Sequence, residues 1–479
     1  MTYKNSTELM QLNGVPIYMN DLAEACLRGR LNLFLQGDTG SGKTQLAQDV
    51  RSYYFGSGVG SGNLAKKVKE KFSDRLDPKA IEAIEATKYF PEDKTLFILG
   101  RNDMDTRELF QQINIGKLHQ TPKYNLEPLV NPDTGELEYY YPKVNKNGVF
   151  VYQKLNEEQA DRVKKELERI AGSTEHIKEL TSKINTNLIV VDELPNCVPA
   201  VRAQLFNLFD GFVELNGKAY PIGNGYSVGI ATGNIGQKFT ESSNELGRAL
   251  KDRMHVIVDT DYFTPKPSDT LEILANNTNP RVEFAQQTKA TKDLIEEHKK
   301  LASREIHLEK LILANYLVHG LDYCSKGSKR KMKDAWPTQL ESHEQGSDVG
   351  LILPVSTRAA KSIIRLSEAL DDIVSEKQPD QSSKDYFDSM MQAFKFVSAY
   401  SGILNPSSVQ ANYNNDFYKA LDAVISTTKT QYDEQKGAIA VGIEMAYEGK
   451  RESKILNKFT GRWEFMRDIL NSISEKSKK

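Results

Sequence analysis

The sequence has few cysteines, and they lack the spacing that cysteine-based sites need. Its 479 residues include only Cys26, Cys197 and Cys324, which lie far apart and form no CxxC pair. A disulfide framework or a zinc knuckle needs paired or closely spaced cysteines, so both are disfavoured. The seven histidines form no HxxxH or HxH pair, which disfavours a histidine-based metal centre. We therefore predict a protein of a reducing compartment.

Long apolar runs are also missing. A helix that crosses a membrane needs about 18 or more apolar residues. The longest apolar stretch, residues 311–321, is interrupted by Asn315, Tyr316 and His319. The first residues, MTYKNSTELMQLNG, show no basic start followed by an apolar segment, so no secretory signal is expected. The sequence predicts a cytoplasmic protein with no membrane association.

Neither sign of charge dominates the chain. There are 63 basic and 65 acidic residues, which gives a formal net charge of −2. This balance is unfavourable for a protein that coats nucleic acid or an acidic membrane. One basic segment, KGSKRKMK at 326–333, could bind nucleic acid or act as a nuclear signal. The neighbouring ESHEQGSD offsets its charge, which favours a solvated loop.

The chain does have a globular composition and alternating strand and helix patterns. Hydrophobic residues make up 39% of it, and its length suggests roughly three domains of about 150 residues each. Helical patterns separate short apolar runs that are typical of buried parallel strands. This alternation predicts an α/β fold with a parallel sheet and helices on both faces, followed by a mainly helical region after Pro265. The predicted strands lie at 31–36, 95–100, 188–191, 227–231 and 255–259.

We predict three domains along the chain. The α/β domain spans 1–265 and carries insertions at about 55–94 and 118–186. A helical region follows at 266–380, and a helical extension follows at 381–479. Within the second insertion, the turn sequences NPDTGE and NKNG adjoin strand-like segments and predict a β-hairpin.

A glycine-rich motif that matches GxxxxGK[ST] follows the first predicted strand. Its glycines let backbone N–H groups approach phosphate oxygens without a clash at Cβ. The helix that begins there directs its positive end at the anion. Lys43 can neutralise the β and γ phosphates, and the Thr44 hydroxyl can bind Mg²⁺. The predicted nucleotide-binding residues are Gly37, Asp38, Thr39, Gly40, Ser41, Gly42, Lys43 and Thr44.

Two carboxylates end the third predicted strand, LIVVDE. Asp192 can hold the Mg²⁺ shell, and Glu193 can orient and polarise an attacking water. Open α/β sheets bind ligands at this edge. A glutamate directly after the metal-binding aspartate favours hydrolysis over transfer to a small acceptor. The sequence has no NKxD motif for reading guanine, so we predict ATP as the nucleotide.

Further polar residues follow the later strands. Asn234 comes just after the fourth strand and could lie beside the γ phosphate, although Asn after Gly is typical of a turn. Arg248 and Arg253 precede the fifth strand, where an arginine can reach a neighbouring subunit's nucleotide. Ser356 is the predicted N-cap of a later helix, with Arg358 in its first turn. Each arginine, taken alone, also fits a structural role.

Taken in order, these segments resemble the AAA+ ATPases, and more narrowly the MoxR group. The resemblance covers about residues 15–375 without the insertions, and the STR of the last segment is similar to the CbbQ, NorQ and GvpN branch. It implies a P-loop NTPase domain followed by an all-helical lid, with the C-terminal extension beyond it. The segments are GDTGSGKT, LIVVDELPNCVPAVRAQLFNLFDG, VELNGKAYPIGNGYSVGIATGN, ALKDRM and VSTRAAKSII.

The resemblance also assigns roles to residues. Asn234 corresponds to the first sensor and Arg253 to the finger, with Arg248 as the alternative finger. Arg358 corresponds to the second sensor, on the lid. The insert at 214–226 resembles a hairpin that points toward the central pore of a ring.

By resemblance, the protein is an ATPase that binds ATP and Mg²⁺ at the subunit interfaces of a hexameric ring and remodels or activates a client protein. A von Willebrand A-domain partner is implied in the same way. One alternative is a nucleic-acid-stimulated motor, such as a helicase or a translocase subunit, supported only by basic segments at 66–71 and 326–333. Another is a nucleotide-gated scaffold with little turnover. The chain is longer than these relatives, and we expect substrate choice to reside in its added segments.

Overall fold

The structure is a computed structural model of the chain, and it divides into two compact units. Residues 105–184 form one unit, and residues 1–104 together with 185–479 form the other. The two units are described separately. The structure describes residues 7–38, 40–55, 94–100, 109–113, 129–131, 137–144, 150–172, 178–215, 218–234, 253–263, 267–275, 291–321, 351–352, 355–379, 385–450 and 453–476.

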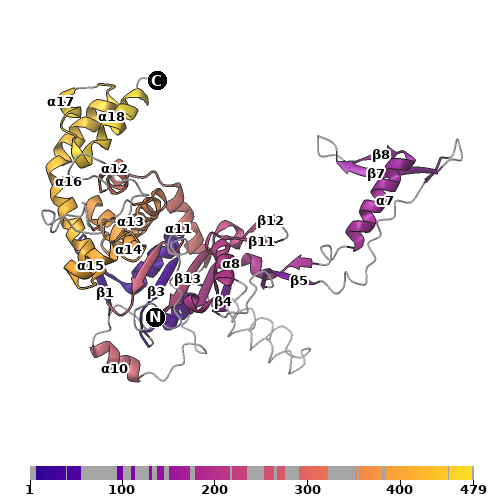
Figure 1. The fold of residues 1–479 in the computed structure, drawn as a ribbon, viewed down its shortest axis with the longest axis horizontal. Coiled ribbons are helices and arrows are strands. Elements are labelled where there is room, and N and C mark those ends of the chain that lie inside the picture. The colour runs from indigo at the N-terminus through magenta and orange to yellow at the C-terminus, as the bar shows by residue number, and fades with distance from the viewer. Residues whose placement is uncertain are drawn as a thin grey trace. The chain divides into compact units, whose positions relative to one another are not determined.

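A five-stranded parallel sheet forms the centre of the larger unit (Figure 1). Its strand order is β14-β3-β13-β10-β4. All five strands overlap the apolar runs that predicted them, because strands covered on both faces need continuous apolar sequence. Strands β10 and β13 extend one and two residues beyond the predicted ends. Their bounds are β3 Leu33–Gln36, β4 Thr95–Leu99, β10 Leu188–Asp192, β13 Val228–Gly233 and β14 Val256–Asp259.

Helices connect the parallel strands and cover the sheet. Helix α2 (Lys43–Phe55) follows β3 and packs against β13 and β10, and α8 (Pro199–Phe209) follows β10 and packs against β13. Helix α1 (Met19–Gly29) leads into β3 after a short antiparallel pair, β1 (Glu8–Leu12) and β2 (Val15–Tyr18). This arrangement confirms the predicted α/β class.

An antiparallel hairpin lies between α8 and β13. It consists of β11 (Phe212–Leu215) and β12 (Lys218–Pro221). The hairpin that the resemblance implied at 214–226 therefore begins and ends earlier in the chain. Residues 223–225 form a helical turn instead, and the Tyr226 hydroxyl donates to the Leu27 carbonyl at 2.8 Å. That buried contact ties the end of the insert to α1.

The described residues after β14 are mainly helical, as predicted. The Ser356 hydroxyl accepts from the Ala359 N–H at 3.1 Å, which confirms the predicted N-cap of α13. Helix α14 packs against both α13 and β14, so it lies beside the β14 edge of the sheet (Figure 1). The predicted division of this region at residue 380 stays a prediction. The helices are α10 Pro267–Ala275, α11 Thr291–Ser303, α12 Leu308–Asn315, α13 Thr357–Lys377, α14 Tyr386–Ser398, α15 Pro406–Tyr413, α16 Phe417–Tyr447, α17 Ser453–Leu456 and α18 Phe465–Lys476.

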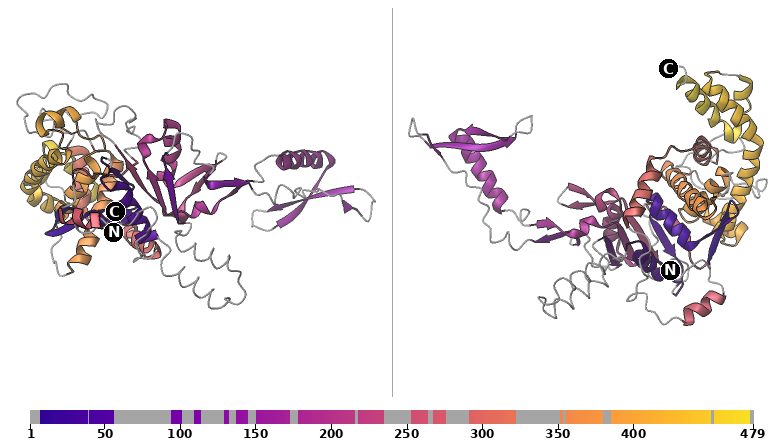
Figure 2. Two further views of the ribbon diagram at one scale, coloured as in Figure 1. Left: turned by 90° about the horizontal axis from the view of Figure 1, so that it is seen from below. Right: turned by 180° about the vertical axis from the view of Figure 1, so that it is seen from behind.

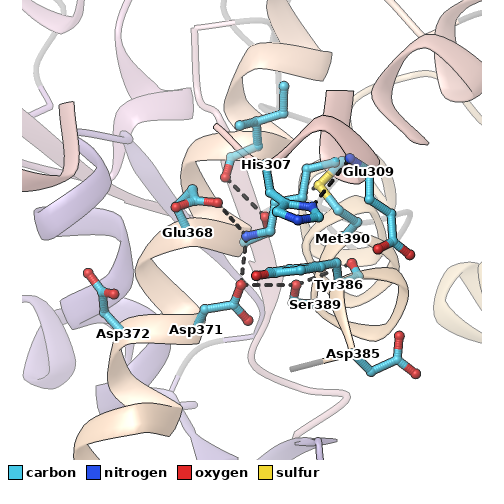
Figure 3. Close-up of polar contacts among 12 residues, drawn as sticks. His307, Glu309, Glu368, Asp371, Asp372, Asp385, Tyr386, Ser389 and Met390 are labelled. Carbon is cyan, nitrogen blue, oxygen red and sulfur yellow. Dashed lines mark hydrogen bonds and ion pairs between the residues drawn. The ribbon is translucent and has the colours of Figure 1, made fainter. Parts of the chain in front are cut away.

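A buried ion cluster fastens α12 to α13 (Figure 3). Lys310 on α12 is 0% exposed, and its Nζ lies 2.6 Å from Glu368 Oε1 and 2.6 Å from Asp371 Oδ2 on α13. Ser389 on α14 also donates to Asp371, at 3.3 Å. Because a buried ammonium needs compensating charge, these three helices are held in one fixed arrangement.

The smaller unit contains the predicted hairpin. Strands β7 (Leu137–Val144) and β8 (Phe150–Leu155) pair antiparallel, and β6 (Leu129–Val130) joins β7. Helix α7 (Glu157–Gly172) packs against β8, and Figure 2 shows the two side by side. Strands β5 (Gln111–Ile113) and β9 (Lys178–Leu180) form a second pair. In the described part of both units, no helix is long and apolar enough to cross a membrane.

Candidate phosphate-binding site

The glycine-rich loop connects β3 directly to α2, and Lys43 is the first residue of that helix. Gly40 and Gly42 have φ of 84° and 82°, a left-handed conformation that glycine adopts without a Cβ clash. At Gly37, a Cβ would lie 2.2 Å from Thr260 Oγ1, so only glycine fits there. The loop therefore folds as the motif requires. Thr39 lies outside the described residues.

Lys43 is buried and turned back over its own loop. Its Nζ donates to the carbonyl oxygens of Gly37 and Asp38, at 3.0 Å and 2.6 Å, and to Ser41 Oγ at 3.2 Å. Burial lowers the pKa of Lys43, and nearby carboxylates, first that of Asp261, act in the opposite direction. A phosphate group would replace neutral carbonyl partners with a full negative charge, so this lysine is suited to bind an anion.

The end of β14 supports the loop, which the sequence patterns did not indicate. Asp38 N–H donates to Asp261 Oδ2 at 2.7 Å. Thr260 Oγ1 lies 2.9 Å from the Gln36 carbonyl oxygen and 2.8 Å from Ser41 Oγ. These contacts join residues more than two hundred positions apart, so only the pairing of β14 with β3 brings them together. No local motif in the sequence could have found them.

The aspartate of the acidic strand meets the loop directly. Thr44 Oγ1 donates to Asp192 Oδ1 at 2.8 Å, and Asp192 is only 3% exposed. The same carboxylate oxygen accepts from Thr232 Oγ1, at 2.5 Å. Sequence reasoning placed Thr44 and Asp192 in one site, and the structure brings them together. It missed Thr232, which precedes Asn234 by two residues and carries no motif of its own.

Glu193 is exposed and has an unusual backbone. Its φ and ψ are 57° and 44°, in the left-handed region. Its N–H donates to Thr232 Oγ1 at 3.1 Å, and its Oε2 accepts from Asn196 Nδ2 at 2.9 Å. Glu193 thus lies where the parallel strands end, directly after Asp192, the residue predicted to bind the metal.

Asn234 follows β13, which lies between β3 and β10. The carboxyl ends of parallel strands meet at the same edge of a sheet. Asn234 therefore lies between Gln36, at the end of β3, and the acidic pair at the end of β10. It is partly buried. The structure therefore gathers Lys43, Thr44, Asp192, Glu193 and Asn234 at one edge. Their catalytic and binding roles stay predictions.

Arg253 lies at the opposite edge of the sheet. Its carbonyl oxygen accepts from Asn32 Nδ2 at 2.9 Å, and Asn32 immediately precedes β3. The guanidinium donates from Nε to Asp210 Oδ2 at 2.9 Å and lies 4.9 Å from the centre of the Phe206 ring. Strand β3 runs between Asn32, which Arg253 contacts, and the phosphate loop. Its residues span about 13 Å at 3.3 Å per residue.

The positive charge of Arg358 acts on His255, next to the start of β14. His255 precedes β14, and its Nδ1 accepts from the Asn32 N–H at 2.9 Å. Burial lowers the pKa of His255 to about 4, and the positive charges of Arg365, Arg358 and Arg30 add to the effect. Arg358 is therefore close enough to His255 for its charge to act on that histidine. The nucleotide contact predicted for Arg358 stays a prediction.

Several predicted features lie outside the described residues. These are Arg248, residues 56–93 of the first insertion (about 55–94), and the basic segments at 66–71 and 326–333. The alternative function as a nucleic-acid motor depended on those two segments. No described contact therefore favours that alternative.

The residues at the carboxyl edge fit a bound magnesium ion. Mg²⁺ prefers hard oxygen ligands and is usually held by one or two carboxylates, phosphate oxygens and water. Thr44 and Asp192 supply a hydroxyl and a carboxylate oxygen that lie 2.8 Å apart. Among the described residues there is no cluster of three or more His, Cys, Asp or Glu side chains that could hold a metal.

The fold and the loop together define the class of protein. A parallel sheet whose strand β3 enters a glycine-rich loop and a helix is the α/β P-loop fold, here with a helical extension. No known family model matches the chain, and no curated protein matches it.

Among solved structures, the chain is similar to a protein of Cytophaga hutchinsonii described as a "putative ATPase". The sequence identity is 14% and the TM-score is 0.46, over 85% of this chain and 88% of that one. Membership of the MoxR group stays a prediction.

Proposed function

We propose that the protein is a P-loop ATPase of the AAA+ type. The observation that carries this proposal is the 2.8 Å contact between Thr44 of the phosphate loop and Asp192 of β10. It joins the two motifs, 148 residues apart, at the edge of the sheet where α/β proteins bind ligands. A loop for phosphate and an acidic pair for metal and water are the parts that ATP hydrolysis needs.

In the proposed reaction, the loop N–H groups and Lys43 bind the phosphates of ATP. Thr44 and Asp192 would hold Mg²⁺, which neutralises charge on the phosphate oxygens when it is bound. Glu193 accepts a proton from water as the water oxygen bonds to the γ phosphorus. The bond from that phosphorus to the β–γ bridging oxygen breaks, which gives ADP and inorganic phosphate. Asn234 is positioned to donate to the γ phosphate or to the water.

The position of Arg253 supports the proposal of a ring. Arg253 contacts Asn32 and Asp210 at the edge of the sheet opposite its own phosphate loop. In a head-to-tail ring, this edge of one subunit can face the phosphate loop of the next. We propose that the ring is a hexamer and that Arg253 stabilises the transferring phosphate in trans.

The proposed cellular role is remodelling of a client protein, and the proposed partner is a von Willebrand A-domain protein. Both the client and the partner are inferred from the resemblance to the MoxR group. The hairpin β11–β12 is the segment that the resemblance directs toward the pore. Its strands follow α8 directly, so a movement of α8 on hydrolysis would be passed to the hairpin.

The ATPase proposal is tested by measuring phosphate release for the wild type, Lys43→Ala and Lys361→Ala. Lys361 is an exposed lysine on α13 and serves as the matched control. We expect Lys43→Ala to lose nucleotide binding and turnover, and Lys361→Ala to match the wild type. Equal turnover in all three proteins would place the chemistry elsewhere.

The ring proposal is tested by mixing two inactive variants, Arg253→Ala and Glu193→Gln. If the arginine acts in trans, an Arg253→Ala subunit keeps its own Glu193 and receives the finger of its neighbour. An equal mixture should then recover about a quarter of the wild-type turnover, since that share of random interfaces is intact. No recovery on mixing would exclude a role in trans.

A further inference from the structure

Thr232 lies between the two acidic residues of the site and contacts both. It is on β13 and is only 1% exposed. Its hydroxyl donates to Asp192 Oδ1 at 2.5 Å and accepts from the Glu193 N–H at 3.1 Å. A single hydroxyl therefore connects the carboxylate of one residue to the backbone of the next.

The contact to Glu193 restrains a backbone that needs support. A non-glycine residue in the left-handed region is uncommon, and it persists when surrounding contacts hold it there. Glu193 has φ 57°. Among the described backbone hydrogen bonds, its carbonyl oxygen accepts only a local one, from the Asn196 N–H at 3.0 Å. The bond to Thr232 instead reaches a neighbouring strand, so it ties the direction of the Glu193 side chain to the sheet.

The contact to Asp192 has a second consequence. Thr44 and Thr232 donate to the same oxygen, Oδ1. If Thr44 turns its hydroxyl oxygen to a metal ion, Thr232 still holds the carboxylate in place. Groups that hydrogen-bond to metal ligands fix their orientation, and their loss commonly lowers metal affinity or activity.

We infer that Thr232 is a positioning residue that sets the metal-binding carboxylate of Asp192 and the water-activating carboxylate of Glu193 in one fixed relation. This inference rests on the proposed ATPase function. Thr232 does not touch the reacting atoms. It acts through the two residues that do, and its effect should therefore appear in the Mg²⁺ dependence and in kcat rather than in nucleotide binding through the loop.

The test compares Thr232→Val, Thr232→Ser and Thr428→Val with the wild type. Valine removes the hydroxyl at nearly constant shape, and serine keeps the hydroxyl. Thr428, on α16, is a matched control, because it is 1% exposed and its hydroxyl has no hydrogen-bond partner in the described part of the chain. For each protein, phosphate release and ATP affinity are measured across a Mg²⁺ titration, and the melting temperature is recorded.

We expect Thr232→Val to lower kcat by about 10- to 100-fold and to weaken the Mg²⁺-dependent gain in ATP affinity by a similar factor. Its ATP affinity without Mg²⁺ should stay within about twofold of the wild type, because the Lys43 contacts are untouched. Thr232→Ser should keep kcat within about threefold, since the hydroxyl is retained, and Thr428→Val should match the wild type.

Two results would overturn the inference. One is a Thr232→Val variant that keeps both kcat and the Mg²⁺-dependent gain. The other is a Thr232→Ser variant as impaired as Thr232→Val, which would mean that the methyl group, and so packing, decides the effect. If the wild type binds ATP but releases no phosphate, the proposed function fails. The Mg²⁺-dependent gain in affinity still tests the role of Thr232 in that case.

Discussion

Replacing Lys310 by methionine should strongly destabilise the helical part of the larger unit. The side chain is fully buried, and both of its ion-pair partners are nearly so, with 11% of the Glu368 side chain and 5% of the Asp371 side chain exposed. Breaking a buried pair from one side costs about 3–5 kcal/mol, because the remaining charge is left uncompensated. Glu368 keeps a 3.3 Å contact with Arg304, so Asp371 carries most of the loss.

The size of the effect should depend on pH. Burial already raises the pKa of Asp371, and Lys310 is the main group that opposes this rise. Without the lysine, the folded variant binds a proton on Asp371 at a pH where the unfolded chain does not. The free energy of unfolding of Lys310→Met therefore falls relative to that of the wild type as the pH rises. We expect a loss of about 3 kcal/mol at pH 7.5 and a clearly smaller loss at pH 5.

The assay is urea unfolding, followed by circular dichroism, of the wild type and Lys310→Met at both pH values. Lys361→Met, at an exposed site on α13, controls for removal of a lysine. A triple variant, Lys310→Met with Glu368→Gln and Asp371→Asn, should recover much of the loss because no unpaired charge remains. A loss under about 1 kcal/mol, or one that is equal at pH 5 and pH 7.5, would refute the reasoning.

Three further predictions concern the site and its surroundings. The pKa of His255 is about 4 in the folded protein and 6.5 in the unfolded chain, so the histidine takes up a proton on unfolding below about pH 6.5. Between pH 7 and pH 5 the free energy of unfolding of the wild type should therefore fall by about 2 kcal/mol more than that of His255→Asn. Gly233→Ala should lower stability by about 1–3 kcal/mol, measured by denaturation, because a Cβ would lie 2.4 Å from Pro195 Cδ. Asn196→Ala should raise ATP turnover up to about fivefold, because it releases the carboxylate of Glu193 from a hydrogen bond worth about 1 kcal/mol. Unchanged pH dependence, stability or turnover in these variants would contradict the respective assignment.

The parallel sheet and the phosphate loop could be predicted because their signals are local. Apolar runs such as 188–191 need no knowledge of the rest of the chain, and the glycines and Lys43 of the loop lie in one short motif. The Ser356 cap is equally local, since its hydroxyl bonds to the Ala359 N–H only three residues later.

The supporting contacts could not be predicted, because they depend on strand order. Thr232 reaches Asp192 and Glu193 only because β13 pairs with β10, and Asp261 reaches Asp38 only because β14 pairs with β3. The position of Arg358 depends on how α13 packs against α1, and no periodicity in the sequence encodes that choice. The hairpin β11–β12 lies earlier than the resemblance placed it, because residues 223–225 form a helical turn and are not part of the hairpin.

The most direct test of the central claim compares ATP binding and phosphate release for the wild type and Glu193→Gln. The claim is that Glu193 activates water at a site whose phosphate and metal contacts come from other residues. The glutamine variant should therefore bind ATP with Mg²⁺ as tightly as the wild type and release phosphate at least about a hundredfold more slowly. Full phosphate release by Glu193→Gln would contradict the claim.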